Sequence, residues 1–286
     1  MLCAGARAAF AQACCAGGAA VYPGRLQLFE DAAVAVGFRL DNQYGSFDGS
    51  GRYAGQPEGA SELDLEQDFL GTVRVWRRGQ IGLLVPIVET HYALAGMSDM
   101  GGGLGDVRLS GRWDFVQAGD DKIIPGIGLI AGVTFPTGTP IEESSPWGVT
   151  GFGAWQLSGG VSLEQVFGQI FTGVTALVSR PFSRSVQNVD TQLGTRLTLI
   201  GAGGYVFDKG QAVIGTLSLL ESGDADVNGR TQPGSGERQL TAGVSAMFPF
   251  SLTWRVQGSL FSDLPVAGQN HLTGFGLTLL LLHAWI

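Results

Sequence analysis

Charged residues recur at every second position in several stretches of this 286-residue chain. In DVRLSGRWDF (106–115), carboxylates and guanidinium groups alternate with apolar or small residues, and DLEQD (64–68) places three carboxylates at the same spacing. Residues two apart on a β-strand lie on one face, roughly 7 Å apart, within reach of partners on neighbouring strands. Such a face could form ion pairs or select polar and charged solutes.

These charged faces predict a polar interior if the strands close into a barrel. Buried charges must be paired or hydrated, so two interpretations stay open. The charges could line a water-containing path that selects solutes, or they could form a ladder of ion pairs that fills a narrow interior. The predicted lumen-lining residues are Arg39, Asp64, Glu66, Asp68, Arg74, Asp106, Arg108, Arg112, Asp114, Arg196 and Arg255.

The residues favour neither catalysis nor a cofactor. The histidines are His91, His271 and His283, and none stands in a local nucleophile–base pattern. Asp224, Asp226 and Asn228 match the first half of a calcium loop, but Ser235 stands where a bidentate glutamate is expected. We therefore expect no enzyme and no cofactor. The segment 224–235 is predicted to be an acidic surface loop, with a calcium site as the alternative.

The elements that position these residues are predicted to be strands. Apolar residues alternate with polar or small ones over 34–41, 63–75, 127–135 and 239–248, and a period of two indicates β-structure. Less clear faces are predicted for 81–91, 147–158, 166–178 and 211–221, and the total is about twelve strands. Only 161–172 could pass for a short helix, and strands flank it.

The connections between the predicted strands alternate between short and long. Short turns are predicted near 77–80, 118–123, 159–163, 208–210 and 249–251, and longer loops separate them. This alternation is typical of outer-membrane barrels, with short periplasmic turns, long extracellular loops and an even number of strands. The sequence holds no run of 18 apolar residues, so a membrane-spanning form must be a closed barrel.

The sequence therefore predicts an all-β fold, a closed antiparallel transmembrane β-barrel of about 12 strands. Charged residues make up only 15% of the chain, against about 25% in soluble domains. The alternative is a soluble β-barrel or sandwich, but glycine, alanine and arginine between the apolar positions disfavour a solvated face. The net charge of −8 argues against nucleic acid as a partner.

Three segments are expected along the chain. Residues 1–15, which hold Cys3, Cys14 and Cys15, are predicted to be a truncated signal or leader. Residues 16–32 would lie in the periplasm or enter the lumen. Residues 33–286 would form the barrel.

Two motifs resemble those of a known family. GLGDVRLSGRWDF (103–115) and PGIGLIAGVTFPTGTP (125–140) are similar to segments of the outer-membrane barrels called the MetA-pathway-of-phenol-degradation family. The resemblance implies a barrel that transports small, often hydrophobic or aromatic, compounds across the outer membrane. The matching residues are Gly103, Leu104, Gly105, Asp106, Pro136, Thr137 and Gly138.

From the sequence we expect a monomer in the bacterial outer membrane that passes or takes up small molecules passively through a charged lumen. Its expected partners are outer-membrane lipid, a small-molecule solute and the barrel-assembly machinery. The alternative from another class is a structural or adhesive surface protein whose lumen is blocked by ion pairs or by residues 16–32. Conductance across a planar bilayer distinguishes the two.

Overall fold

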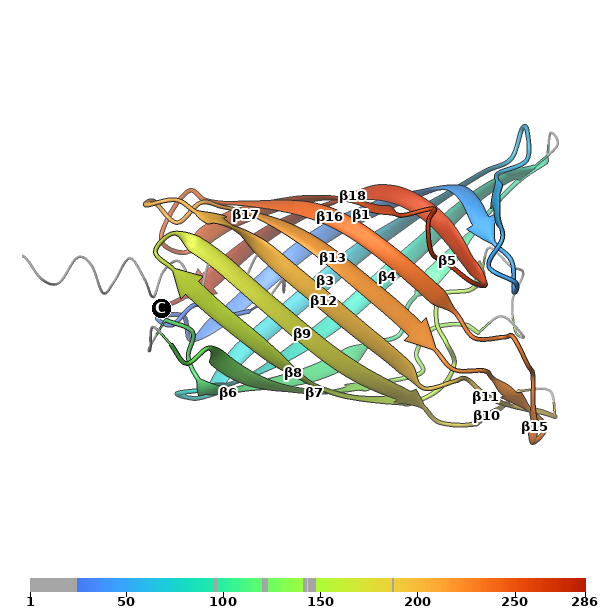
Figure 1. Ribbon diagram of the computed structural model, residues 1–286, viewed down its shortest axis with the longest axis horizontal. Coiled ribbons are helices and arrows are strands. Elements are labelled where there is room, and N and C mark those ends of the chain that lie inside the picture. Colours follow the sequence, from blue (N-terminus) through green and yellow to red (C-terminus); the bar gives the residue numbers. More distant parts are fainter. Residues whose placement is uncertain (1–24, 95–96, 120–122, 141–142, 144–147, 187) are drawn as a thin grey trace, which may run out of the picture.

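The computed structural model describes residues 25–94, 97–119, 123–140, 143, 148–186 and 188–286. Within these ranges, no helix is long and apolar enough to cross a membrane. Long antiparallel strands dominate the described chain (Figure 1). The strands that form the barrel wall are β1 (Ala32–Phe47), β3 (Ser61–Trp76), β4 (Gly79–Leu94), β6 (Arg108–Val116), β7 (Gly126–Thr134), β8 (Gln156–Phe167), β9 (Ile170–Pro181), β12 (Arg196–Val206), β13 (Ala212–Ser222), β16 (Arg238–Pro249), β17 (Trp254–Asp263) and β18 (His271–Trp285).

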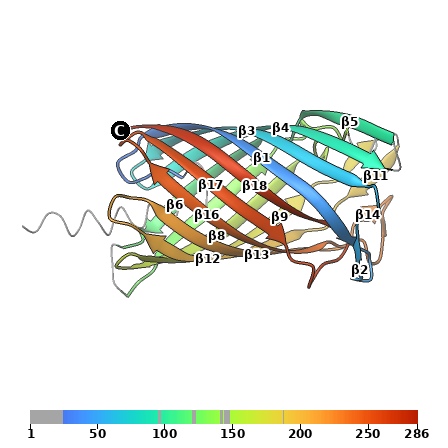
Figure 2. The ribbon, with the colours of Figure 1, turned by 90° about the horizontal axis from the view of Figure 1, so that it is seen from above.

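The sheet closes on itself, as the sequence predicts. Each wall strand pairs with the next one in the chain, and β18 pairs with β1 from Ala32–Trp285 to Phe47–His271. Figures 1 and 2 show the resulting cylinder from two directions. Closure leaves no free sheet edge, so the backbone hydrogen bonds of the wall are made inside the protein. The prediction of a closed barrel of about 12 strands is confirmed.

The two faces of each wall strand differ in the way the alternation predicts. On β1, Val34 and Phe38 are each 48% exposed on the outer face, whereas Ala33 and Ala35 are buried on the inner face. On β18, Phe275 and Leu279 are exposed, and Leu280 and its inner-face neighbours are buried. The barrel thus presents apolar side chains outward over strands of 9 to 16 residues, long enough to cross a hydrocarbon layer.

Short turns gather at one end of the barrel, with the C-terminus, and long loops gather at the other (Figure 1). The predicted strand 147–158 and turn near 159–163 are wrong, because β8 runs through Gly159 and Gly160 and turns at Gly168 instead. Gly160 allows β8 and β9 to pack closely, since a Cβ at this position would lie 2.2 Å from the Ala176 backbone oxygen. Gly168 has a φ of 66°, which favours glycine and suits the turn.

Short strands lie within the connections at the long-loop end. They are β2 (Tyr53–Gly55), β5 (Met97–Leu104), β10 (Arg184–Val186), β11 (Val189–Gln192), β14 (Asp226–Val227) and β15 (Arg230–Thr231). The long loop expected after the predicted strand 81–91 is largely strand, because β5 pairs with β4 from Ile87 to Leu94. The pairing of β4 passes from β6 to β5 around Pro86, which has no N–H to donate.

Candidate functional site inside the barrel

Residues 25–31, here called the floor segment, cross the interior at the short-turn end. Leu26 packs in a buried cluster with Ala33 and Ala35 of β1 and with Leu280 and Leu282 of β18. The Arg74 guanidinium on β3 donates to the Gln27 oxygen at 2.5 Å and to the Glu30 oxygen at 2.8 Å. The Leu26 N–H donates to the Gln80 side chain on β4 at 3.1 Å. A segment without strand structure is therefore held by the wall around it.

Two charged residues anchor the floor segment on opposite walls. Glu30 is fully buried and accepts hydrogen bonds from both terminal nitrogens of Arg255 on β17. Arg25 donates to Glu164 on β8 at 2.5 Å, with its side chain 7% exposed. Since β8 and β17 lie far apart in the closed strand order, these anchors span the interior.

An ion-pair network continues from Arg25 along the wall. Arg112 donates to Asp114 at 2.8 Å and to Glu164 at 3.0 Å, and Asp114 also lies 4.0 Å from Arg25. Arg112 and Glu164 are 9% and 4% exposed. A buried charge without such partners would be strongly unfavourable. At this end, the predicted lumen residues Arg74, Arg112, Asp114 and Arg255 are therefore engaged in holding the floor segment or its neighbours.

The middle of the interior carries an excess of carboxylates. Asp41, Asp64, Glu66 and Asp68, here called the acidic belt, lie on the inner faces of β1 and β3. Arg39 contacts Asp41 at 3.3 Å and Glu66 at 3.9 Å, and its side chain remains 44% exposed.

Other side chains complete this level of the interior. Thr90 donates to Asp64 at 2.6 Å, and the Arg39 guanidinium lies 4.8 Å from the Phe261 ring centroid. Arg108 is exposed and lies close enough to Asp68 to attract its charge. Because the inward-facing Arg39 and Arg108 are exposed although the wall surrounds them, water reaches this level of the interior.

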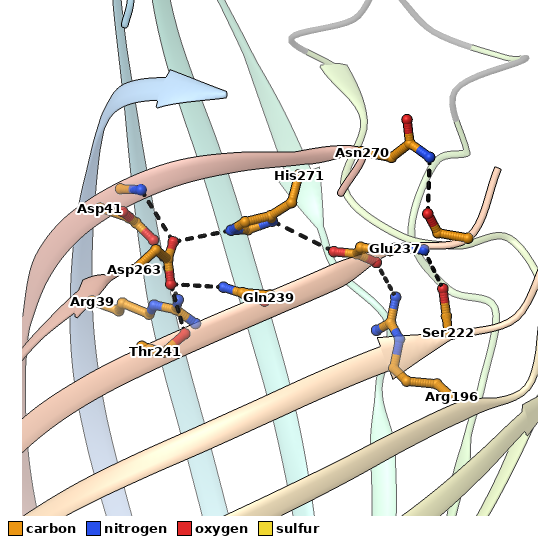
Figure 3. Close-up of polar contacts among 12 residues, drawn as sticks. Arg39, Asp41, Arg196, Ser222, Glu237, Gln239, Thr241, Asp263, Asn270 and His271 are labelled. Atoms are coloured by element: carbon orange, nitrogen blue, oxygen red, sulfur yellow. Dashed lines mark hydrogen bonds and ion pairs between the residues drawn. The ribbon is translucent and has the colours of Figure 1, made fainter. Parts of the chain in front are cut away.

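A second polar network joins strand ends at the long-loop end (Figure 3). His271 lies 3.2 Å from Asp263 and 3.5 Å from Glu237, so it links β17 to the residue that precedes β16. Glu237 also accepts from Arg196 of β12 at 3.0 Å. Asp263 accepts from Thr241 at 2.6 Å as well. The network ties together three loop-bearing hairpins around the mouth of the barrel.

The pKa of Glu237 lies below its ordinary value. Partial burial of the carboxylate raises the pKa, but the hydrogen bond from His271 and the charge of Arg196 together lower it by more. Glu237 is therefore held as a carboxylate at neutral pH, which keeps its ion pair with Arg196 intact.

The two motifs that carry the family resemblance meet in the structure. The Asp106 carboxylate accepts from the Gly138 N–H at 2.9 Å and from the Phe152 N–H at 2.7 Å. The Thr137 hydroxyl donates to the Gly105 oxygen at 2.7 Å and accepts from the Val107 N–H at 2.9 Å. Through these hydrogen bonds, this motif junction (Gly105, Asp106, Thr137 and Gly138) links the loop after β7 to the short segment between β5 and β6. Among the described residues, the hydrogen-bond partners of Asp106 are thus backbone N–H groups and not charged side chains.

The remaining histidines lie on the outside of the barrel. His91 contacts Glu89 at 2.7 Å near the long loops. His283 lies among tryptophans at the short-turn end, 4.5 Å from Trp254 and 4.6 Å from Trp285 between ring centroids. Neither stands beside the charged interior.

The loop considered for calcium uses its oxygens within the protein. Asp224 accepts from the Gly236 N–H at 2.9 Å, Asp226 accepts from Thr231 at 2.6 Å, and the Asn228 side chain accepts from the Asp190 N–H at 2.9 Å. Among the described residues, no group of three or more His, Cys, Asp or Glu side chains could hold a metal ion.

Sequence patterns did not mark five residues of these networks as site residues, namely Arg25, Glu30, Glu164, Glu237 and Asp263. Glu164 was not recognised as an inward-facing residue because the predicted turn was misplaced. The strand that runs through 156–167 puts Glu164 on the inner face with Ser162. Glu30 lies outside any periodic segment, so no sequence pattern marks its burial. The predicted leader with its three cysteines, and the first part of segment 16–32, lie outside the described residues.

Comparisons with known proteins identify the family of the chain and a solved structure that shares its fold. The family model described as "Putative MetA-pathway of phenol degradation" matches residues 17–281. The COG4313 outer membrane channel from Pseudomonas putida F1 is 15% identical, with a TM-score of 0.75 over 90% of this chain and 96% of that one. The CymD monoaromatic hydrocarbon channel is 9% identical, with a TM-score of 0.48 over 94% and 93% of the two chains. No curated protein matches the sequence.

Proposed function

The chain belongs to the family described as putative MetA-pathway of phenol degradation, and from that premise we propose that it is a passive channel of the bacterial outer membrane. It passes small molecules, including hydrophobic and aromatic ones, through its charged interior. The long loops face the cell exterior, and the short turns and the floor segment face the periplasm.

One observation carries the proposal. The guanidinium of Arg39 is 44% exposed although the wall encloses it, so the middle of the barrel holds water-accessible space. A barrel of about eight strands is filled by side chains, whereas wider barrels leave room for a ligand or a channel. The twelve-stranded wall therefore supports a path that reaches down to the floor segment. The shared fold with the COG4313 outer membrane channel agrees with this assignment.

The floor segment gives specific support to a second candidate. Its anchors, Arg25 to Glu164 and Glu30 to Arg255, lie across the interior and obstruct straight passage along the barrel axis. A permanently blocked barrel would act as a structural or adhesive surface protein. We favour the channel, with the floor segment as an element that must move or be bypassed.

Further properties follow as part of the proposal. The barrel acts as a monomer, because the β1–β18 pairing completes the wall without a second chain. Its apolar outer face contacts outer-membrane lipid, and the barrel-assembly machinery inserts it. The interior serves transport and not catalysis.

Conductance measurements on the purified chain in planar bilayers test the channel. We expect discrete openings, and we expect proteoliposomes that contain the barrel to take up small neutral solutes faster than empty liposomes. A barrel that is folded by circular dichroism and heat-modifiable mobility, yet neither conducts nor speeds uptake, would contradict the channel and support the blocked barrel.

A further inference from the structure

The long-loop end of the barrel holds a cavity of about 290 Å³. We propose that this cavity is a capture site for an uncharged single-ring solute that carries a hydroxyl or amide group. The inference rests on the proposed channel function, and it adds the place and the residues at which a solute is first held. Five of the lining residues would form the site: Phe152, Pro181, Leu193, Arg196 and Glu237.

The apolar side of the cavity suits a flat ring. Phe152 is 39% exposed, so its ring is partly free to contact a solute. The Phe152 ring also faces the Arg196 guanidinium, which lies 5.1 Å from the ring centroid. Leu193 and Pro181 supply further apolar surface. Aromatic rings pack favourably in stacked or edge-to-face arrangements. The cavity volume lies just below the range of about 300–1,000 Å³ for ligand pockets, which suits a small solute.

The polar side of the cavity offers a donor and an acceptor together. Arg196 and Glu237 form an ion pair at 3.0 Å, and their side chains remain 25% and 27% exposed. A hydroxyl or amide can accept from the guanidinium and donate to the carboxylate at once, whereas a bare hydrocarbon satisfies neither. The pair therefore gives orientation to a solute whose ring lies against Phe152.

The charges along the interior favour a neutral solute. Arg196 and Glu237 neutralise one another in their ion pair at 3.0 Å, so this pair offers an ion of either sign no uncompensated charge. An ion would lose hydration on entering the cavity, a cost that a neutral solute avoids. Below the cavity, the acidic belt outnumbers Arg39 and Arg108, which repels an anion on the way inward.

The motif junction sets the position of Phe152. Asp106 accepts from the backbone N–H of Phe152 itself at 2.7 Å, while its other oxygen holds Gly138. Asp106 is therefore a positioning residue: it touches no solute, but it fixes the ring that does. An asparagine at this position would retain only one acceptor oxygen in place of two.

Calorimetric titration of the full chain in detergent tests the site. Benzyl alcohol is the neutral probe, and benzoate and benzylammonium are its charged counterparts. We expect benzyl alcohol to bind more tightly than either ion, and Phe152→Ala to raise its Kd about three- to tenfold, as expected for a lost aromatic contact. Phe115→Ala, which removes an exposed ring outside the cavity (53% exposed), serves as the matched control and should leave the Kd unchanged.

Asp106→Asn gives an independent measurement. We expect faster hydrogen exchange at the Phe152 amide and weaker binding of benzyl alcohol, with the barrel still folded. Unchanged binding in Phe152→Ala, or tighter binding of either ion than of benzyl alcohol, overturns the capture site. Conductance of the same preparation separates the two proposals: a conducting barrel that fails the binding test loses only the capture site, and a binding barrel that does not conduct loses only the channel.

Discussion

At the scale of single residues, ion pairs in this barrel differ greatly in their surroundings. Glu164 is 4% exposed and is shared by Arg25 and Arg112, whereas Glu221 and Arg238 pair at the loop end with 47% exposure each. Removing one partner of a buried pair leaves an uncompensated charge, whereas exposed pairs contribute little.

We therefore expect Glu164→Ala to lower the free energy of unfolding by about 3–5 kcal/mol. Glu221→Ala is the matched control, with an expected loss of about 0–1 kcal/mol. Urea titration of the barrel folded into phospholipid vesicles measures both. Equal losses in the two variants would show that Glu164 is not the buried centre of the network.

Glu237 predicts a pH dependence at the barrel mouth. Its pKa is lower in the folded protein than its ordinary value of 4.5, so its contribution to stability is complete at neutral pH and is lost as the pH falls below that value. Glu237→Gln should destabilise the barrel at pH 7, and the difference from the parent chain should shrink toward pH 3. Unfolding measured at both pH values checks this, and a constant difference would contradict it.

At the scale of elements, the floor segment is held by wall strands and not by structure of its own. Its described internal support is one turn, in which the Gln27 N–H donates to the Glu30 carboxylate at 2.8 Å and the Glu30 N–H donates to the Gln27 backbone oxygen at 3.1 Å. Its position therefore depends on Arg255 and Arg74 reaching inward from β17 and β3.

Glu30→Ala should loosen this segment and leave Arg255 without its carboxylate partner. We expect more frequent or larger openings in planar bilayers and faster proteolysis between residues 25 and 31. Glu58→Ala, in an exposed loop, is the control and should behave like the parent chain. If conductance in Glu30→Ala stays at the parent level, the floor segment is not what limits passage.

At the scale of the whole molecule, the barrel places apolar surface outside and polar surface inside. Leu217 and Ser218 are neighbours in the middle of β13, and Leu217 is 51% exposed on the outer face. Leu217→Arg should cost about 2–4 kcal/mol in a bilayer, as charged residues do on the lipid face near the midplane. Ser218→Arg points inward and should cost less. The same urea titration compares them, and an inverted order would mean that the faces are assigned wrongly.

The local part of this structure could be predicted from the sequence. Alternation over β1, β3, β7 and β16 identified the outer and inner faces, because side chains of a strand point to opposite sides in turn. The one misplaced turn arose where Gly159 and Gly160 resembled a turn, although β8 runs through both and Gly160 permits close packing against β9. Similarly, the two family motifs were visible as sequence, but their hydrogen bonds to one another were not.

The sequence by itself determined most of the wall strands, their two faces and the closed barrel, because these depend on neighbours along the chain and on the need to pair every backbone group. Only the tertiary structure decided which charges meet. Arg25 and Glu164 are 139 residues apart, and Glu30 and Arg255 are 225 apart. A period of two places a side chain inside the barrel, but it does not specify the register around the cylinder or the path of a non-periodic segment across it. Those follow from the closure of the sheet, which brings distant strands to opposite sides of one interior.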